Sequence, residues 1–394
     1  MLTIYGRHYE NGEPVRIRVD GKRIAAVEPA WPPRNMAAWP YVAPGLFDLQ
    51  INGHGGIWFG KSGITVDEVL SVLKRHFRFG LTRLCPTLIT NSFEALAGAF
   101  AAMRTACEQE PWADRLVPGC HLEGPYISAE DGPRGAHPLE HVRPPDWVEF
   151  ERLNEISGRR IRLITLAPEL PGAIDFIRRA VGSGVVVAIG HTAATGEQIA
   201  AAVDAGARLS THLGNGAHGT IRRHPNYIWE QLGDPRLSAS VIADGYHLPP
   251  SVLRSILRAK SARNVIVTCD AAGLAGCPPG VYTEGAMRME ILADGRIVIA
   301  GQRQLLAGSS AETGRCVVEA VRQGGVTLRE AIDMAGRNPA RLLGFEEIRL
   351  RRGARADLFL FNAPPESNSL DVVATVAAGT LQFGTIPSFP GSGE

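Results

Sequence analysis

The chain has 394 residues, 45% of them hydrophobic, and its 41 basic and 40 acidic side chains leave a net charge of +1. This balance argues against a nucleic-acid or membrane-surface binder, whose footprint would be basic. The opening stretch lacks a signal-peptide pattern, no apolar run reaches membrane-spanning length, and the six cysteines include no Cys-x-x-Cys pair. We therefore expect a cytoplasmic globular protein with one large and one small domain.

Both ends of the chain are predicted to be rich in strands. An Asp-Gly turn at Asp20 predicts a hairpin near the N-terminus, and a Pro/Trp-rich link follows it at residues 29–40. We expect the two ends to build one small β-sandwich domain from residues 1–42 and 345–394. The strand-like runs at the two ends are 2–6, 15–21, 23–29, 353–362 and 372–384.

Between the ends, apolar runs alternate with amphipathic stretches, several of which end in glycine as helix C-termini often do. Eight strands alternating with helices predict an α/β fold, a TIM-like (β/α)₈ barrel, which we place at residues 43–344. After the last strand comes an insertion with a hairpin at 286–301 and two helices, 309–325 and 327–344. The predicted barrel strands are 41–51, 81–89, 115–124, 161–169, 184–192, 208–213, 237–245 and 264–271.

Polar residues gather where four of the predicted barrel strands end. They are Glu123, His191, His212 and Asp270. Active sites in this fold lie at the carboxyl ends of the strands, where residues distant in sequence converge. A carboxylate and two imidazoles can bind Zn²⁺ and leave a position for water, whose proton a further carboxylate can take. Each residue alone is more often structural, but the combination predicts a metal-dependent hydrolase.

The tip of the first barrel strand carries a different polar set. Strand alternation predicts Asp48, Gln50 and Asn52 on one face, with His54 just beyond them. Neutral amides are poor ligands for Zn²⁺ beside imidazole. We therefore expect one divalent ion, Zn²⁺, per subunit, and a loop or substrate-contact role for His54.

Short motifs carry a resemblance from about residue 42 to Phe361. They resemble those of the N-acetylglucosamine-6-phosphate deacetylase family, within the amidohydrolase superfamily. The resemblance implies a barrel with a small β-sandwich domain, removal of the acetyl group from an N-acetylated amino sugar, and a homodimer whose subunits share their substrate sites. The motifs are "APGLFDLQINGHGG", "PTLIT", "HLEGPYI", "IGHTAAT", "THLGNG", "IADGYH", "CDAAG" and "LAGSS".

The resemblance also implies roles for individual residues. Glu123, His191 and His212 match the family's metal ligands, Asp270 its catalytic Asp, and His137 a histidine near the scissile carbonyl. In the implied mechanism Asp270 takes the proton of a water and later protonates the leaving amine, while the metal or His137 stabilises the oxyanion.

Substrate contacts follow from the same resemblance. The backbone of Asn215 and Gly216 matches a loop that lines the substrate site, and His247 matches a residue that grips the sugar phosphate. Arg223 matches an arginine that comes from the neighbouring subunit. The residue types agree with these roles, since a guanidinium presents a planar fork to phosphate or carboxylate.

The loop after His212 departs from the family's pattern. "GNGAHG" stands where the family usually has Asn-Ala-Met, and "RRHPNYIWEQL" where it usually has Arg-Glu-Pro-Gly. The substrate therefore stays open between N-acetylglucosamine 6-phosphate, N-acetylgalactosamine 6-phosphate and a sugar without phosphate. Four large side chains crowd this loop, namely His218, His224, Tyr227 and Trp229.

Three other functions stay open. A cyclic amide hydrolase would share the barrel, but many such enzymes use two metals bridged by a carboxylated lysine, and no predicted strand tip presents a lysine. A non-catalytic barrel would be indicated by loss of a ligand or of the Asp, and neither is lost. A sugar-phosphate isomerase would not need this His/His/Glu set.

Overall fold

The predicted barrel is present in the computed structural model, which describes residues 1–31, 39–285, 287–364 and 366–387. Eight parallel strands pair in chain order, and a parallel bridge between Ile51 and Ala271 joins the last to the first. The Asn52 N–H donates to the Ala271 carbonyl at 2.8 Å at this closure. The barrel strands are β5 (Leu46–Ile51), β8 (Leu81–Ile89), β9 (Cys120–Glu123), β10 (Ile161–Leu166), β11 (Val186–Ile189), β12 (Leu209–Ser210), β13 (Ser238–Ile242) and β14 (Val265–Thr268).

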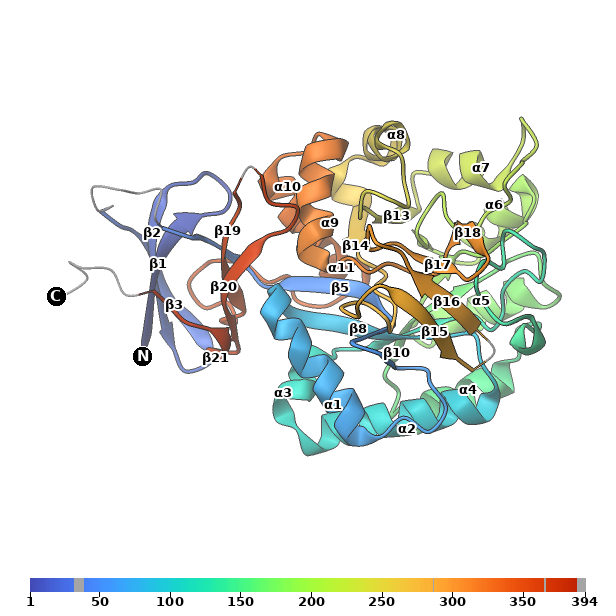
Figure 1. The fold of residues 1–394 in the computed structure, drawn as a ribbon, viewed down its shortest axis with the longest axis horizontal. Helices are drawn as coiled ribbons and strands as arrows, with labels where there is room; N and C mark the ends of the chain where they lie inside the picture. The colour runs from blue at the N-terminus through green and yellow to red at the C-terminus, as the bar shows by residue number, and fades with distance from the viewer. Residues whose placement is uncertain (32–38, 286, 365, 388–394) are drawn as a thin grey trace.

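Helices surround these strands, as the amphipathic pattern predicted (Figure 1). Their starts are encoded locally: Thr65 and Glu68 form a capping box at one helix, and Thr195 and Gln198 form another. The helices of the barrel are α1 (Val66–Arg75), α2 (Phe93–Gln109), α3 (Pro111–Leu116), α4 (Trp147–Ile156), α5 (Ala173–Gly182), α6 (Gly196–Asp204), α7 (Tyr227–Gly233) and α8 (Pro250–Lys260).

The two chain ends build one seven-stranded sheet beside the barrel, so the expectation that they form a common β domain is confirmed (Figure 1). Most of the Pro/Trp-rich link, residues 32–38, lies outside the described residues. The exact domain bounds stay a prediction. In sheet order the strands are β21 (Thr380–Gly384), β20 (Asp371–Ala377), β19 (Leu358–Asn362), β4 (Tyr41–Pro44), β1 (Leu2–His8), β2 (Pro14–Asp20) and β3 (Arg23–Pro29).

The predicted strand 41–51 is two strands. Residues Tyr41–Pro44 pair in the terminal sheet as β4, and the chain enters the barrel as β5 only after Gly45. A side chain at Gly45 would collide with Thr82 of β8, since a Cβ there would lie 2.1 Å from Thr82 Oγ1. The glycine therefore allows the chain to pass closely from one sheet to the other.

The insertion after β14 contains more strands than the predicted hairpin. Its four-stranded antiparallel sheet includes that hairpin, and the two predicted helical stretches follow it. Within the described residues, no helix is both long and apolar enough to cross a membrane. The strands are β15 (Gly280–Glu284), β16 (Met287–Ile291), β17 (Ile297–Ile299) and β18 (Gln302–Leu306), and the helices α9 (Thr313–Glu319), α10 (Leu328–Met334) and α11 (Arg337–Leu342); a short antiparallel pair, β6 (Gly53–His54) and β7 (Ile57–Trp58), follows β5.

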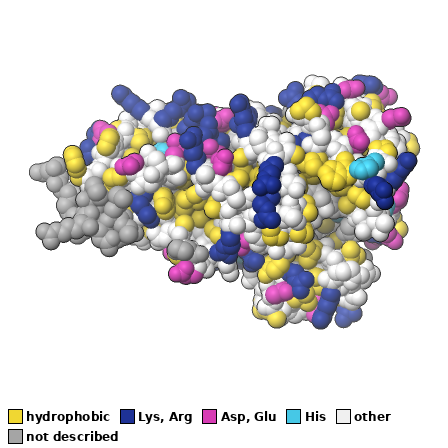
Figure 2. Space-filling view, turned by 90° about the horizontal axis from the view of Figure 1, so that it is seen from above, with side chains coloured by type: hydrophobic (Ala, Val, Ile, Leu, Met, Phe, Trp, Pro, Cys, Tyr) yellow, Lys and Arg dark blue, Asp and Glu magenta, His cyan; other side chains and the backbone are white. Residues whose placement is uncertain are grey.

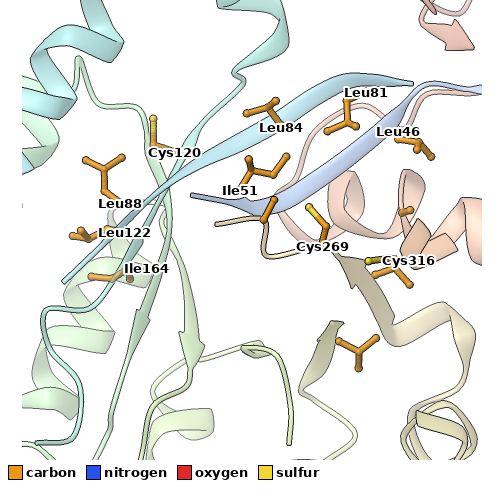
Figure 3. Packing of buried hydrophobic residues seen from close by; sticks show 14 of the residues in the cluster. Leu46, Ile51, Leu81, Leu84, Leu88, Cys120, Leu122, Ile164, Cys269 and Cys316 are labelled. Carbon is orange, nitrogen blue, oxygen red and sulfur yellow. The ribbon is translucent and has the colours of Figure 1, made fainter. Parts of the chain in front are cut away.

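Two apolar layers position the functional end of the barrel. Between strands and helices lies the main core, part of which Figure 3 shows around Leu84, Leu88 and Leu122. Inside the barrel a second cluster packs against the α11 segment and fills the interior away from the carboxyl ends of the strands. Polar groups are thereby left to the carboxyl ends of the strands. The interior cluster comprises Phe47, Leu49, Cys85, Leu163, Ala188, Leu209, Ile266, Ala340 and Leu343.

Candidate metal centre and active site

Three of the predicted residues converge at the carboxyl ends of neighbouring strands. Glu123 ends β9, while His191 and His212 lie just beyond β11 and β12. Glu123 Oε1 lies 3.2 Å from His191 Nε2 and 3.0 Å from His212 Nε2, and the two imidazole nitrogens are 3.1 Å apart. All three side chains are buried. One point in the barrel mouth is thus within reach of three metal-ligating atoms.

The tautomer of His191 is fixed by its other nitrogen. Nδ1 lies 2.8 Å from the Pro133 carbonyl oxygen, which can only accept, so Nδ1 carries the hydrogen. In the neutral imidazole, Nε2 then turns a lone pair toward Glu123 and His212. A metal-ligating histidine is oriented in this way in most proteins.

Asp270 stands beside this trio, held by the first strand. Gln50 Nε2 donates to Asp270 Oδ1 at 3.0 Å and to Glu123 Oε1 at 2.9 Å, and Asn52 Nδ2 donates to Asp270 Oδ1 at 2.8 Å. The amide pair therefore bridges the two carboxylates. In this position the amides neutralise part of the repulsion between two buried acids.

Asp48 does not share the face of Gln50 and Asn52, so the simple alternation predicted for this strand is wrong. The Asp48 carboxylate accepts from Thr313 Oγ1 at 2.7 Å and from the Cys269 N–H at 2.9 Å, and it also accepts from Thr268 Oγ1. The pairing of β5 with β8 shifts register between Asp48 and Ile51. Such an irregularity turns successive side chains away from strict alternation.

Burial and neighbouring charges set the protonation of these groups. Burial alone would raise the pKa of Glu123, but the imidazoles of His191 and His212 beside its carboxylate hold that pKa well below the ordinary value. Burial, and then the Glu123 charge, raise the pKa of Asp270. Burial and the nearby His191 lower the pKa of His137 to about 3, so its imidazole is neutral at physiological pH.

A cavity of about 360 Å³ opens above the trio, within the size range of small-molecule sites. His137 is one of its lining residues, and its Nδ1 lies 2.8 Å from Thr90 Oγ1. Arg223 is exposed and does not line it among the described residues. The other predicted residues that do line the cavity are Glu123, His191, His212, Asn215, Gly216, His247 and Asp270.

A buried carboxylate orients His247 toward this cavity. His247 Nδ1 lies 2.7 Å from Asp244 Oδ2, and the other Asp244 oxygen accepts the backbone N–H groups of Tyr246 and His247. Ser309 Oγ donates to Asp244 Oδ2 at 2.8 Å. The "IADGYH" and "LAGSS" motifs therefore meet at one carboxylate.

With this geometry in view, comparison with known proteins assigns the family. Residues 41–382 match the Amidohydrolase family. The chain belongs to that family. It is 33% identical over 346 residues to an N-acetylgalactosamine-6-phosphate deacetylase of Escherichia coli O157:H7, covering 87% of this chain and 89% of that relative. It is 34% identical over 351 residues to an N-acetylglucosamine-6-phosphate deacetylase of Bos taurus, covering 86% and 83% of the two chains.

Solved structures agree with that assignment. A variant of N-acetyl-D-glucosamine-6-phosphate deacetylase from Mycobacterium smegmatis, in complex with N-acetyl-D-glucosamine-6-phosphate, superposes with a TM-score of 0.83 at 32% identity. The match covers 94% of each chain. The eight-stranded barrel of this amidohydrolase is thus the fold of that enzyme, as the motifs predicted.

The trio fits the metal that amidohydrolases generally require. Three atoms with lone pairs, one carboxylate oxygen and two imidazole nitrogens, face one another at 3.0–3.2 Å. Buried acceptors at these separations repel unless a cation lies among them. Two histidines and a glutamate form a ligand set typical of catalytic zinc.

His54 lies away from this amidohydrolase centre. Its Nε2 is 2.8 Å from Glu312 Oε1, and its ring packs beside His76 and Phe79. It is not among the described residues that line the cavity. The structure thus places His54 in a buried polar contact outside the barrel mouth.

Backbone strain marks the same site. His191, His212 and Asp270 have φ values of 52°, 28° and 51°. Residues other than glycine rarely adopt this left-handed conformation, and it concentrates at active sites. Three strand-end residues therefore turn sharply so that their side chains point into one space.

Several contributors to the site could not be found from the sequence. Thr90 holds His137, and the Pro133 carbonyl holds His191, but neither residue carries a chemical signal of its own. Met287 and Leu305 reach the cavity from the inserted sheet. The insertion was visible as a hairpin pattern, whereas its position over the barrel mouth depends on tertiary packing.

Proposed function

We propose that the protein is a metal-dependent deacetylase that converts N-acetylglucosamine 6-phosphate and water to glucosamine 6-phosphate and acetate. One observation carries the proposal: Asp270 stands beside the Glu123/His191/His212 trio, joined to it by Gln50. A hydrolase needs such a carboxylate next to the ion that activates water. The relatives that share the fold across most of the chain bear the names of amino-sugar phosphate deacetylases.

Glu123, His191 and His212 would hold one Zn²⁺ per subunit. When bound, this ion supplies Lewis acidity, which lowers the pKa of a water molecule and polarises a carbonyl. The amide character of Gln50 and Asn52 supports a single ion, because these residues stand where a second imidazole pair would be needed and both already bind Asp270.

Asp270 moves the proton in the proposed reaction. Gln50 and Asn52 both donate to its Oδ1, which leaves Oδ2 to accept the proton of the attacking water. The same carboxyl then delivers that proton to the amine nitrogen as the C–N bond breaks. Its raised pKa suits both halves of this transfer, since a weaker acid is a better base.

His137 would stabilise the oxyanion as a neutral donor. When Nδ1 accepts from Thr90 Oγ1, Nε2 carries the hydrogen and can donate to the carbonyl oxygen of the substrate. Burial keeps this imidazole uncharged. A fixed donor of this kind strengthens its hydrogen bond as charge develops on the oxygen.

The sugar phosphate would be held by His247 and by the backbone of Asn215 and Gly216 in one subunit, and by Arg223 of a second subunit. Arg223 is exposed, and the nearby Ile221 and Trp229 expose 38% and 54% of their surface. At the end of the molecule that carries α7, apolar side chains lie beside a histidine and basic side chains (Figure 2). Such a mixed surface suits a homodimer contact. We place this dimer in the cytoplasm, where the free cysteines of the chain would stay reduced.

The alternative substrate is N-acetylgalactosamine 6-phosphate. It appears in the name of the relative from Escherichia coli O157:H7, which is 33% identical to this chain. Acetate release from the two phosphorylated sugars, from both free sugars and from N-acetyl amino acids separates the possibilities. We expect the highest kcat/KM on N-acetylglucosamine 6-phosphate. A higher value on the galactosamine epimer would replace the proposed substrate, and turnover of none of these compounds would refute the function.

A further inference from the structure

One wall of the cavity is a loop at residues 128–137, which has no helix or strand of its own. Gly132, Gly135 and Ala136 of this loop line the cavity together with His137. The loop also supplies the Pro133 carbonyl that fixes the tautomer of His191. The position of the loop therefore decides the orientation of one proposed metal ligand and of the proposed oxyanion donor.

His218, which lies against this loop, holds it through a chain of hydrogen bonds. The His218 backbone N–H donates to Tyr227 Oη at 2.9 Å, and Tyr227 Oη lies 3.0 Å from His218 Nδ1. His218 Nε2 lies 3.0 Å from Glu130 Oε2. Since the phenol oxygen already accepts the backbone N–H, its own hydrogen points to Nδ1, and Nε2–H donates to Glu130.

This series of hydrogen bonds has a buried end at Tyr227 and an exposed end at Glu130. Tyr227 is buried, with 6% of its surface accessible, and it begins α7, which Asn226 caps. The Glu130 side chain is 64% exposed. Tyr227 thus fixes His218, and the Nε2–H of His218 in turn holds the loop at Glu130.

The 128–137 loop also packs closely against the backbone of the loop that carries His218. Gly132 has φ +96°, and a Cβ on it would lie 2.9 Å from His218 Cα and 3.0 Å from the Ala217 carbonyl oxygen. The 128–137 loop therefore rests directly on the backbone at Ala217–His218. A shift of His218 moves the surface on which the loop rests.

We propose that His218 is a positioning residue that, through Tyr227 and Glu130, locks the 128–137 loop in place and so secures metal retention at His191 and the placement of His137. This inference rests on the proposed function for its catalytic consequence only. His218 lies in the stretch "GNGAHG", which stands where the family usually has Asn-Ala-Met.

The test compares His218→Phe, Tyr227→Phe and His218→Gln in the zinc-loaded protein. Phenylalanine keeps the size of the imidazole without its hydrogen bonds, whereas a glutamine amide can accept from Tyr227 and donate to Glu130. His224→Phe is the matched control, since His224 is an exposed histidine of the same loop. Three rates are measured: trypsin cleavage after Arg134, identified by peptide mass, zinc loss to a chelator, and acetate release.

We expect His218→Phe and Tyr227→Phe each to raise cleavage after Arg134 and zinc loss by up to about tenfold, because a loosened loop no longer holds the Pro133 carbonyl against His191. Complete loss of such an orienting partner weakens metal binding by about 10- to 100-fold. His218→Gln should restore most of the protection, and His224→Phe should match the wild type. The double variant His218→Phe/Tyr227→Phe should be cleaved and should lose zinc no faster than either single variant, since both substitutions break the same chain of hydrogen bonds.

Rates in His218→Phe equal to those of the wild type, or a double variant whose effect is the product of the single ones, would overturn the proposal. Cleavage and zinc loss test the role of His218 even if the wild type releases no acetate from any sugar. Absence of acetate release would count only against the proposed function. If acetate is released, His218→Phe should lower kcat/KM and should also weaken zinc retention, which a purely substrate-binding role would not change.

Discussion

At the residue scale, the site combines strained backbone with neighbouring acids that titrate differently. His191, His212 and Asp270 occupy the left-handed region, each at a cost of about 1–3 kcal/mol. Glu123 keeps its charge while the pKa of Asp270 rises, although Gln50 binds both. One carboxylate is thereby suited to bind a cation and the other to exchange a proton.

Replacing Asp270 by asparagine tests the proton-transfer role. We expect Asp270→Asn to bind zinc and fold normally, since the amide oxygen can still accept from Gln50 and Asn52, while kcat falls by about 10²–10⁴-fold because the general base and acid is lost. Acetate release and metal content of the same preparation are the measurements. A variant that retains more than about a tenth of wild-type kcat would contradict the assignment.

Asp244 gives a prediction about pH and stability. Burial opposes its charge, but the hydrogen bond to His247 prevails and lowers the pKa of Asp244 to about 2 from 3.8. A depressed pKa contributes stability that is present above about pH 4 and is lost as the pH falls toward 2. Asp244→Asn should cost about 2 kcal/mol in free energy of unfolding near about pH 6.

Urea denaturation of wild type and Asp244→Asn between about pH 6 and pH 3 measures this difference, which should shrink as the pH falls. Asp175→Asn serves as the control, because the Asp175 side chain is 84% exposed and pairs only with Arg178 among the described residues. A constant gap between wild type and Asp244→Asn at every pH would show that the carboxylate charge contributes nothing.

Residue chemistry was the most predictable part of the site. Glu123 ends β9, and His191, His212 and Asp270 each lie two residues beyond a strand, so their convergence follows from the fold. The positions of Thr90, Pro133 and Asp244 relative to these residues depend on loops, which carry no periodicity. Asp48 was misplaced because a register shift cannot be seen in an alternating sequence.

At the scale of elements, the fold requires glycine at some positions and would accept a side chain at others. Gly45 joins the terminal sheet to the barrel against Thr82, whereas a Cβ on Gly98 of α2 would point into open space. Sequence periodicity predicted both the strand and the helix, but not the crossing point, because 41–51 reads as one strand-like stretch.

Alanine substitutions test that difference. Gly45→Ala should lower the free energy of unfolding by about 1–3 kcal/mol, because the new methyl group overlaps Thr82. Gly98→Ala should raise it by about 0.5–1 kcal/mol, since alanine favours an exposed helix. Denaturation midpoints measure both changes. Equal effects of the two substitutions would mean that the close contact at Gly45 imposes no constraint.

At the scale of the whole molecule, the main question is whether a second subunit completes the substrate site. The barrel and the common domain of the two chain ends were predictable, because strand patterns and their order determine them. The inserted sheet over the cavity was not, and Arg223 lies outside the cavity of its own chain. The homodimer proposed above, with its shared site, would account for the exposure of Arg223.

Mixing two inactive variants tests the shared site. In a dimer of an Asp270→Asn subunit with an Arg223→Ala subunit, one site has both residues intact if Arg223 acts across the interface. Unfolding and refolding an equimolar mixture should therefore recover about a quarter of wild-type activity, since about half of the dimers are mixed. No recovery, in a sample whose mixed dimers are verified by mass, would place Arg223 in its own subunit's site, and an Arg223→Ala variant that is active by itself would place it outside both.

The most direct test of the central claim is acetate release from N-acetylglucosamine 6-phosphate by one preparation before metal removal, after it, and after zinc is restored. The account predicts that activity disappears with the metal, returns in full at one zinc per chain, and does not return in Glu123→Gln. Full activity without metal, or a requirement for two zinc ions per chain, would contradict it.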